Sequence, residues 1–203
     1  MAAVVVTAGN SWGPVMELLL FCATSPNAEH RGLTGEQVRS CQGIIDGKPF
    51  DVRMASPIPG VLNTARQVLG LDVEETPLIE ILPELTYQYG SQDEIVFDAI
   101  FQTIGNMTLA TCYREGGMTA LMRFGRNAWE KTRGIIEGCG AEYAIVFCES
   151  VLAQALAQAM IGTQHAFADQ LVDLALKPGQ GLSITFDGDT VSIEVLKEPA
   201  LTA

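Results

Sequence analysis

Polar side chains that could bind a ligand come directly after an apolar run near the N-terminus. Residues 18–21 are all large and apolar, and turn-forming residues follow them, which is typical of a buried strand that ends in a loop. Thr24, Asn27 and Arg31 stand in this turn and just beyond it. In an open α/β sheet, ligands bind outside the carboxyl ends of the strands. We therefore expect a functional site between residues 21 and 31.

Two later segments also read as strands that end in polar residues. The alternation over residues 50–54 predicts a second strand, and Ser56-Pro57 follows it. The clearest buried strand is 143–147, which runs through Cys148-Glu149-Ser150 into an Ala/Leu-rich helix over 151–162. The carboxyl ends of parallel strands lie at one edge of a sheet, so we expect Glu149 to lie near the end of the first strand.

The order and spacing of these motifs resemble the histidine phosphatase (phosphoglycerate mutase-like) superfamily. Thr24-x-x-Asn27-x-x-x-Arg31 matches the end of that family's Arg-His-Gly-x-Thr-x-x-Asn-x-x-x-Arg motif. Ser56-Pro57 and Thr64-Ala65 match its Ser-Ser-Pro-Leu-x-Arg-Ala-x-x-Thr-Ala segment at the correct spacing. The resemblance implies an α/β fold in three layers, in which helices flank a mostly parallel central sheet.

The resemblance covers residues 15–196, but the residues that would perform the family's chemistry are absent. Phosphohistidine catalysis needs an imidazole nucleophile, a second imidazole and two arginines that hold the phosphoryl oxygens. At these four positions the sequence has, in that order, Phe21, Glu149, Leu20 and Gly60. An alternative alignment on residues 7–10 places Ala8 at the nucleophile, so it also lacks the histidine. We therefore expect no catalytic residue of the family type.

The resemblance leaves a set of ligand-binding candidates. Glu80 corresponds to the glutamate that is commonly the family's proton donor, although it could equally be a solvated acid, and Glu84 lies one turn away. We expect the ligand-binding residues to be Asn27, Arg31, Glu80 and Glu149. Because an isolated buried charge is costly, Glu149 is expected to accept hydrogen bonds from Arg31 or from backbone amides of its own loop. Glu80 and Glu149 could also form a paired-carboxylate site, but no spacing requires it.

Other nucleophiles and ligands are weaker candidates. The chain has only two histidines, His30 and His165, and neither stands among potential catalytic partners, so we expect structural or surface roles. Cys22 and Cys148 each lie at a strand end, but no histidine is adjacent to them in the sequence. No metal ligand set and no cofactor motif is present, so we expect neither a metal nor a cofactor.

The remaining elements follow from periodicity and turn signals. Thr34 and Gln37 have the spacing of a capping box at the start of a helix. Apolar residues at helical spacing predict helices over 93–112 and 119–136. Asp187-Gly188-Asp189 between two alternating segments predicts an antiparallel hairpin.

Composition and charge limit the kinds of partner. The chain has 203 residues, 48% of them hydrophobic, which suits one domain with a large core. We expect residues 1–14 to be an N-terminal extension and residues 15–203 to be a single domain. With 24 acidic and 12 basic residues the formal net charge is −12, which argues against nucleic acids and anionic membranes as partners.

Five scattered cysteines without CxxC spacing argue against a disulfide framework and indicate a reducing cytoplasm. The sequence shows neither a signal peptide nor a membrane-spanning run.

We therefore expect a non-catalytic protein of the histidine phosphatase fold, a pseudoenzyme that binds or scaffolds a protein or a small-molecule partner. A homodimer is left open. One alternative is a divergent hydrolase that uses Glu149, Glu80 or a cysteine. A second alternative is the phosphatase or mutase activity that the family resemblance implies.

Overall fold

The fold is given by a computed structural model, which describes residues 6–7, 15–24, 33–87, 91–103 and 108–196. The strands are β1 (Val6–Thr7), β2 (Met16–Thr24), β3 (Val52–Ala55), β4 (Glu80–Ile81), β5 (Tyr143–Glu149), β6 (Gly181–Asp187) and β7 (Thr190–Leu196). The α-helices are α1 (Gly35–Ile45), α2 (Pro59–Leu69), α3 (Gln92–Thr103), α4 (Leu109–Arg114), α5 (Met118–Cys139), α6 (Ser150–Ile161) and α7 (Ala168–Asp173). Two short 3₁₀ helices are η1 (Val73–Leu78) and η2 (Pro83–Leu85).

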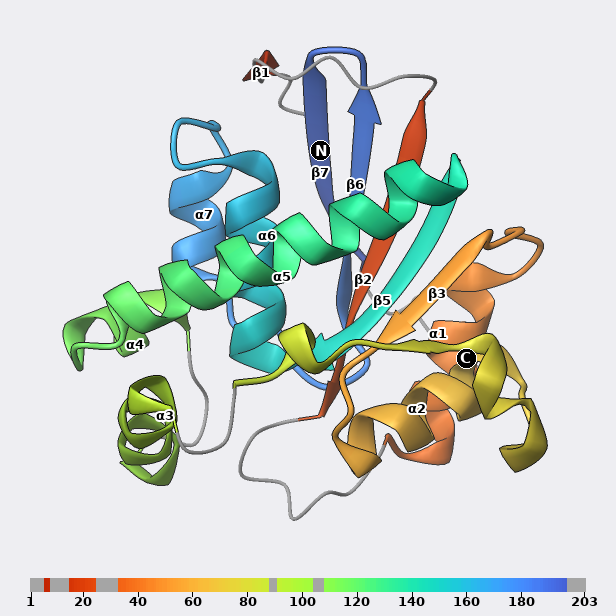
Figure 1. Cartoon of the computed structure of the whole chain (residues 1–203), viewed down its shortest axis with the longest axis horizontal. Coiled ribbons are helices and arrows are strands. Elements are labelled where there is room, and N and C mark those ends of the chain that lie inside the picture. The colour runs from red at the N-terminus through yellow and green to blue at the C-terminus, as the bar shows by residue number, and fades with distance from the viewer. Residues whose placement is uncertain (1–5, 8–14, 25–32, 88–90, 104–107, 197–203) are drawn as a thin grey trace, which may run out of the picture.

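One seven-stranded sheet forms the middle layer, in the order β1-β7-β6-β2-β5-β3-β4 (Figure 1). The strands β2, β5, β3 and β4 run parallel to one another. The C-terminal hairpin β6–β7 joins the other side of β2 in antiparallel orientation. Helices pack on both faces of the sheet. The predicted α/β fold, with a parallel central sheet flanked by helices, is confirmed.

The central strand β2 is buried on both faces. Leu18, Leu20 and Cys22 belong to the core that also contains residues of α5 and α6. Leu19 and Phe21 belong to the core formed with α1 and α2. All five side chains are at most 1% exposed. Successive side chains of a strand point to opposite faces, so burial on both faces explains the unbroken apolar run at 18–21.

Most predicted elements are present, with some changes in their bounds. The capping box is confirmed, since the amide of Gln37 donates to Thr34 Oγ1 and the amide of Thr34 donates to Gln37 Oε1. The hairpin is also confirmed, with Gly188 in the left-handed region (φ 56°) at its turn. The prediction of one helix over 93–112 is wrong, because α3 and α4 are separate helices. The sequence between them contains the pair Gly105-Asn106, which is a turn signal.

The predicted N-terminal extension contributes to the sheet. Val6 and Thr7 pair with Val191 and Thr190 of β7 in antiparallel register. The chain between this pair and residue 15 lies outside the described residues. The boundary at residue 14 therefore stays a prediction.

The helices α5 and α6 pack unusually closely at Gly125. A Cβ atom added to this glycine would lie 2.4 Å from the carbonyl oxygen of Ala155 and 3.3 Å from Cβ of Ala159. Gly134, on the same helix, would meet nothing within 4 Å. Glycine at 125 therefore permits the close approach of two helices, whereas glycine at 134 does not serve that purpose.

We expect Gly125→Ala to lower the free energy of unfolding by about 2 kcal/mol, because the added methyl group overlaps a backbone carbonyl of α6. The matched control Gly134→Ala should raise it by up to about 1 kcal/mol, since alanine is the better helix former where space is free. Urea unfolding followed by circular dichroism measures both. Equal stability of the two variants would show that α5 does not approach α6 as closely as described.

Candidate functional site

The carboxyl ends of β2, β3 and β5 meet at one edge of the sheet. In the parallel register, Cys22 lies opposite Cys148 and Thr24 lies opposite Glu149. On the other side of β5, Ala55 at the end of β3 lies opposite Phe147. The structure thus brings three of the segments singled out from the sequence to a common edge. This edge is where ligands bind in open α/β sheets.

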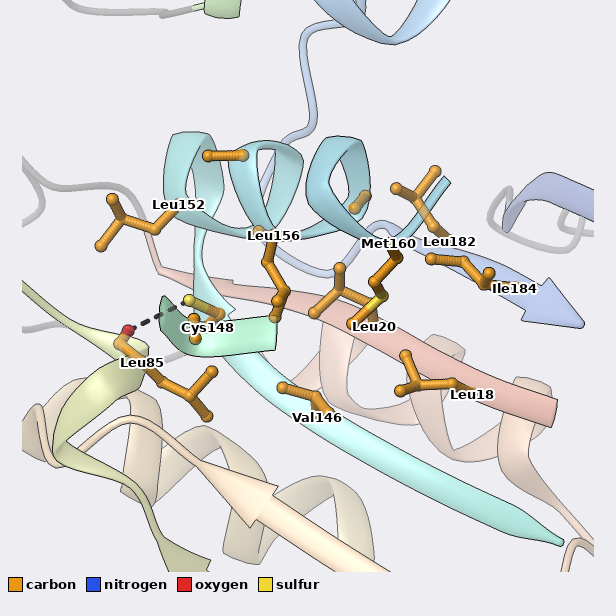
Figure 2. Close-up of a cluster of buried hydrophobic side chains, with 14 of the residues drawn as sticks. Leu18, Leu20, Leu85, Val146, Cys148, Leu152, Leu156, Met160, Leu182 and Ile184 are labelled. Atoms are coloured by element: carbon orange, nitrogen blue, oxygen red, sulfur yellow. Dashed lines mark hydrogen bonds between the residues drawn. The ribbon is translucent and has the colours of Figure 1, made fainter. Parts of the chain in front are cut away.

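Leu20 and Phe21, which stand where the family has an arginine and the nucleophilic histidine, lie inside the core. Leu20 is fully buried on the side of α6, as Figure 2 shows, where Leu156 and Met160 lie next to it. Phe21 is 1% exposed and stacks on Phe147 of β5, with ring centroids 5.8 Å apart. The position of the second arginine, Gly60, is buried in the first turn of α2. None of these three positions can offer a polar side chain to a ligand.

Glu149 is the buried ionisable group of this edge. It ends β5, occupies the N-cap position of α6 and is only 6% exposed. Its side chain makes no capping hydrogen bond, and among the described residues its buried Oε2 has no partner. Burial raises the pKa of Glu149 from its ordinary value of 4.5 to about 7, because the charged form loses its hydration.

Of the two expected kinds of partner, the first amides of α6 do not bind the side chain of Glu149. The shorter side chains of Ser, Thr, Asp and Asn are the ones that fold back onto the first helical amides. Arg31, the other expected partner, lies outside the described residues, and so do Asn27 and His30. The positive end of the α6 dipole remains as a favourable influence on the charged form of Glu149.

Cys148, next to Glu149, is a hydrogen-bond donor within the core. Its Sγ donates to the carbonyl oxygen of Leu85 at 3.2 Å, which joins η2 to the end of β5 (Figure 2). Complete burial raises the pKa of the Cys148 thiol well above its ordinary value, with the nearby Glu149 as a smaller cause. A thiol must ionise to act as a nucleophile. Cys148 therefore suits a structural role better than the nucleophilic role considered from the sequence.

The two candidate acids of the β4 region lie in different surroundings. Glu80 is exposed on the edge strand β4, where it pairs with Met54 of β3. Glu84 lies in η2, and its Oε2 is buried without a hydrogen-bond partner among the described residues. The sequence favoured Glu80 because of its neighbours in the motif. Glu84 as a whole is half-buried, and its η2 helix packs against α5, a contact between distant segments that no local pattern predicts.

His165 is remote from the carboxyl edge. It follows α6, whose 12 residues separate it from Glu149 by about 18 Å of helix. One ring nitrogen, Nδ1, accepts from the amide of Phe167 at 3.1 Å, and Nε2 lies 3.0 Å from the carbonyl oxygen of Val191. Since Nδ1 accepts, Nε2 carries the proton and donates to Val191. His165 thus fastens the segment after α6 to β7.

The described ranges contain neither a metal-binding cluster nor a helix that could cross a membrane. Among these residues, no group of three or more histidine, cysteine, aspartate or glutamate side chains could hold a metal ion. None of the five cysteines forms a disulfide bond, and four of them are buried. Within the same part of the chain, no helix has both the length and the apolar character needed to cross a membrane.

Comparisons with known proteins relate the chain to a fold rather than to a sequence family. No protein-family model matches the sequence, and a search of curated proteins also finds no match. Solved structures, in contrast, superpose on this chain over most of both lengths. Bacillus stearothermophilus YhfR aligns with a TM-score of 0.62 at 16% identity and covers 91% of this chain and 98% of its own.

Two further structures agree. The phosphoglycerate mutase of Bacillus anthracis aligns with a TM-score of 0.55 at 13% identity, covering 92% of this chain and 93% of its own. The alpha-ribazole phosphatase of Shigella flexneri aligns with a TM-score of 0.53 at 17% identity, covering 89% and 96%. On these similarities, together with the sheet order and the strand-end site described above, the chain has the histidine phosphatase (phosphoglycerate mutase-like) fold.

Proposed function

We propose that this protein is a pseudoenzyme of the histidine phosphatase fold, which acts by binding and not by phosphoryl transfer. The observation that carries the proposal is the number of imidazoles. Phosphohistidine chemistry needs two of them at the site, and the chain has two histidines in all. One of these, His165, is buried and hydrogen-bonded to Val191 of β7. At most one histidine, His30, is then left for the carboxyl edge.

The charge at the carboxyl edge also opposes phosphate binding. The site that holds a phosphoryl group needs fixed positive donors, whereas here the buried ionisable group is the carboxyl of Glu149. Two like charges 4 Å apart repel by about 4 kcal/mol at an effective dielectric constant of 20. A phosphate group at this edge would therefore be repelled whenever Glu149 is ionised.

One feature favours the alternative of a divergent hydrolase. A carboxyl group with a pKa of about 7 is well suited to general acid–base catalysis near neutral pH. Against this reading, Glu80 is exposed on an edge strand and the Cys148 thiol is kept protonated by burial. Glu149 is then left without a second catalytic group among the described candidates, so we rank binding first.

The proposed role includes a cytoplasmic location and needs no cofactor. Disulfide bonds are rare under reducing conditions, and none of the five cysteines forms one. The formal charge of −12 favours basic or cationic partners over polyanions. The proposed partner is therefore a cationic molecule or surface.

We expect the purified protein to hydrolyse p-nitrophenyl phosphate and to isomerise 3-phosphoglycerate no faster than background, because the two-imidazole machinery is missing. A colorimetric assay and a coupled mutase assay measure the two rates. Glu149→Gln should leave both at background. Turnover that survives repurification and is lost in Glu149→Gln would overturn the pseudoenzyme proposal and support the hydrolase.

The buried carboxyl of Glu149 should make stability fall as the pH rises. Since its folded pKa, about 7, lies above its ordinary value of 4.5, folding takes up a proton between these values. The stability of the protein with a protonated Glu149 is therefore fully present below pH 4.5, and this contribution is lost as the pH rises through 7 and the buried carboxyl ionises. Glu149→Gln, which has no charge to bury, should be more stable than the wild type by about 3 kcal/mol at pH 8 and by under about 1 kcal/mol at pH 5.

Urea unfolding at the two pH values measures this difference. Glu80→Gln removes the same charge at an exposed position and serves as the control, for which we expect no comparable gain. A Glu149→Gln variant that is less stable than the wild type at pH 8 would show instead that the ionised carboxylate has a stabilising partner.

A further inference from the structure

A second candidate site is a pocket of about 250 Å³ that is lined by residues of η2, α3 and α5. Glu84 of η2 lines it, together with Phe97 of α3 and Phe124 of α5. The pocket has room for roughly eight water molecules and is a little smaller than the roughly 300–1,000 Å³ of typical ligand sites. Its size therefore suits a small organic molecule.

Aromatic rings form the apolar part of the pocket wall. Phe97 and Phe124 are 1% and 7% exposed, so their positions are set by the core. The ring of Tyr87 packs on Phe97 with centroids 5.4 Å apart and also lines the pocket. Aromatic faces carry negative charge density, and they attract both apolar groups and cations.

The charged groups of the pocket leave one negative charge without a partner. Arg123 Nη1 lies 3.3 Å from each carboxylate oxygen of Asp93, so these two side chains neutralise each other. Glu84 is half-buried, and its buried Oε2 has no hydrogen-bond partner among the described residues. A buried acceptor without a donor is unfavourable. A ligand that brings a cationic hydrogen-bond donor to Glu84 would therefore satisfy this acceptor.

We infer that this pocket binds a small organic cation, whose primary ammonium group bonds to the carboxylate of Glu84 while its apolar body packs on Phe97, Tyr87 and Phe124. The inference rests on the proposed binding function and names the chemical class of its ligand. The acidic surface of the whole chain raises the local concentration of such a cation.

Other ligand classes fit the pocket less well. An anion would have to compete with Asp93 for Arg123 and would meet the unpaired charge of Glu84. A metal ion would need more ligands than the described part of the pocket supplies, since no cluster of three suitable side chains is found there. A neutral apolar molecule would leave Glu84 without a donor.

Phenethylamine is the probe, because its ammonium group and phenyl ring match the two parts of the pocket. Isothermal titration calorimetry should show saturable binding of one molecule per chain at pH 8. The neutral analogue 2-phenylethanol has the same shape without the charge, and it should bind at least tenfold more weakly. The anion 3-phenylpropionate and inorganic phosphate should give no measurable heat.

Glu84→Gln should weaken phenethylamine binding at least tenfold, since the amide keeps the shape of the side chain but not its charge. The matched control is Glu74→Gln, which removes one negative charge from η1, outside the pocket and exposed to solvent. It should leave the affinity unchanged. Circular dichroism verifies that both variants are folded, and Phe97→Leu offers an independent test through loss of the ring.

Three results would overturn the inference. The first is that phenethylamine does not bind, and the second is that both glutamate variants weaken its binding equally, which would mean that only the overall charge matters. The third is binding of 3-phenylpropionate that is lost in Arg123→Met, which would make the pocket an anion site. Phosphate-ester turnover would refute the proposed function instead, so the two failures are distinguishable.

Discussion

The parallel pairing of β2 with β5 is the interaction on which the rest of the structure depends. It joins an N-terminal strand to one more than a hundred residues later, in register from Glu17 opposite Tyr143 to Cys22 opposite Cys148. Both strands are buried on two faces, so each contributes side chains to both hydrophobic cores. Such a pair excludes water from its backbone hydrogen bonds, and it delivers both strand ends to one edge of the sheet.

That edge combines the geometry of a catalytic site with residue types that suit packing. Phe21 stacks on Phe147, and the Cys148 thiol donates a hydrogen bond to the carbonyl oxygen of Leu85. These contacts fill space and satisfy polar groups, so they stabilise the fold and keep Phe21 and the Cys148 thiol inside the core. Glu149 differs from these residues, because burial opposes its charged form instead of stabilising it. A buried carboxyl that gains no described partner is costly for folding, which is consistent with a role in binding that its surroundings do not reveal.

The neighbouring pocket has a different origin from the edge. Its walls come from η2, α3 and α5, which are inserted between the parallel strands β3 and β5 in the chain order. The hydrogen bond from Cys148 to Leu85 fixes η2 against the sheet and thereby places Glu84 beside the aromatic rings. The same contact therefore links the carboxyl edge of the sheet to the neighbouring pocket.

The sequence by itself determined the class of fold and the strand ends that form the site, because hydrophobic period, capping residues and turn residues are local signals. The run at 18–21, the Thr34–Gln37 box and the turn at Gly188 could each be read from a few neighbouring residues. Only the tertiary structure decided that Leu20 and Phe21 enter different cores on opposite faces of the sheet, that Glu149 is buried without a described partner and that Glu84 lines a pocket. Burial and electrostatic environment depend on contacts between residues far apart in the chain, and no local pattern encodes them.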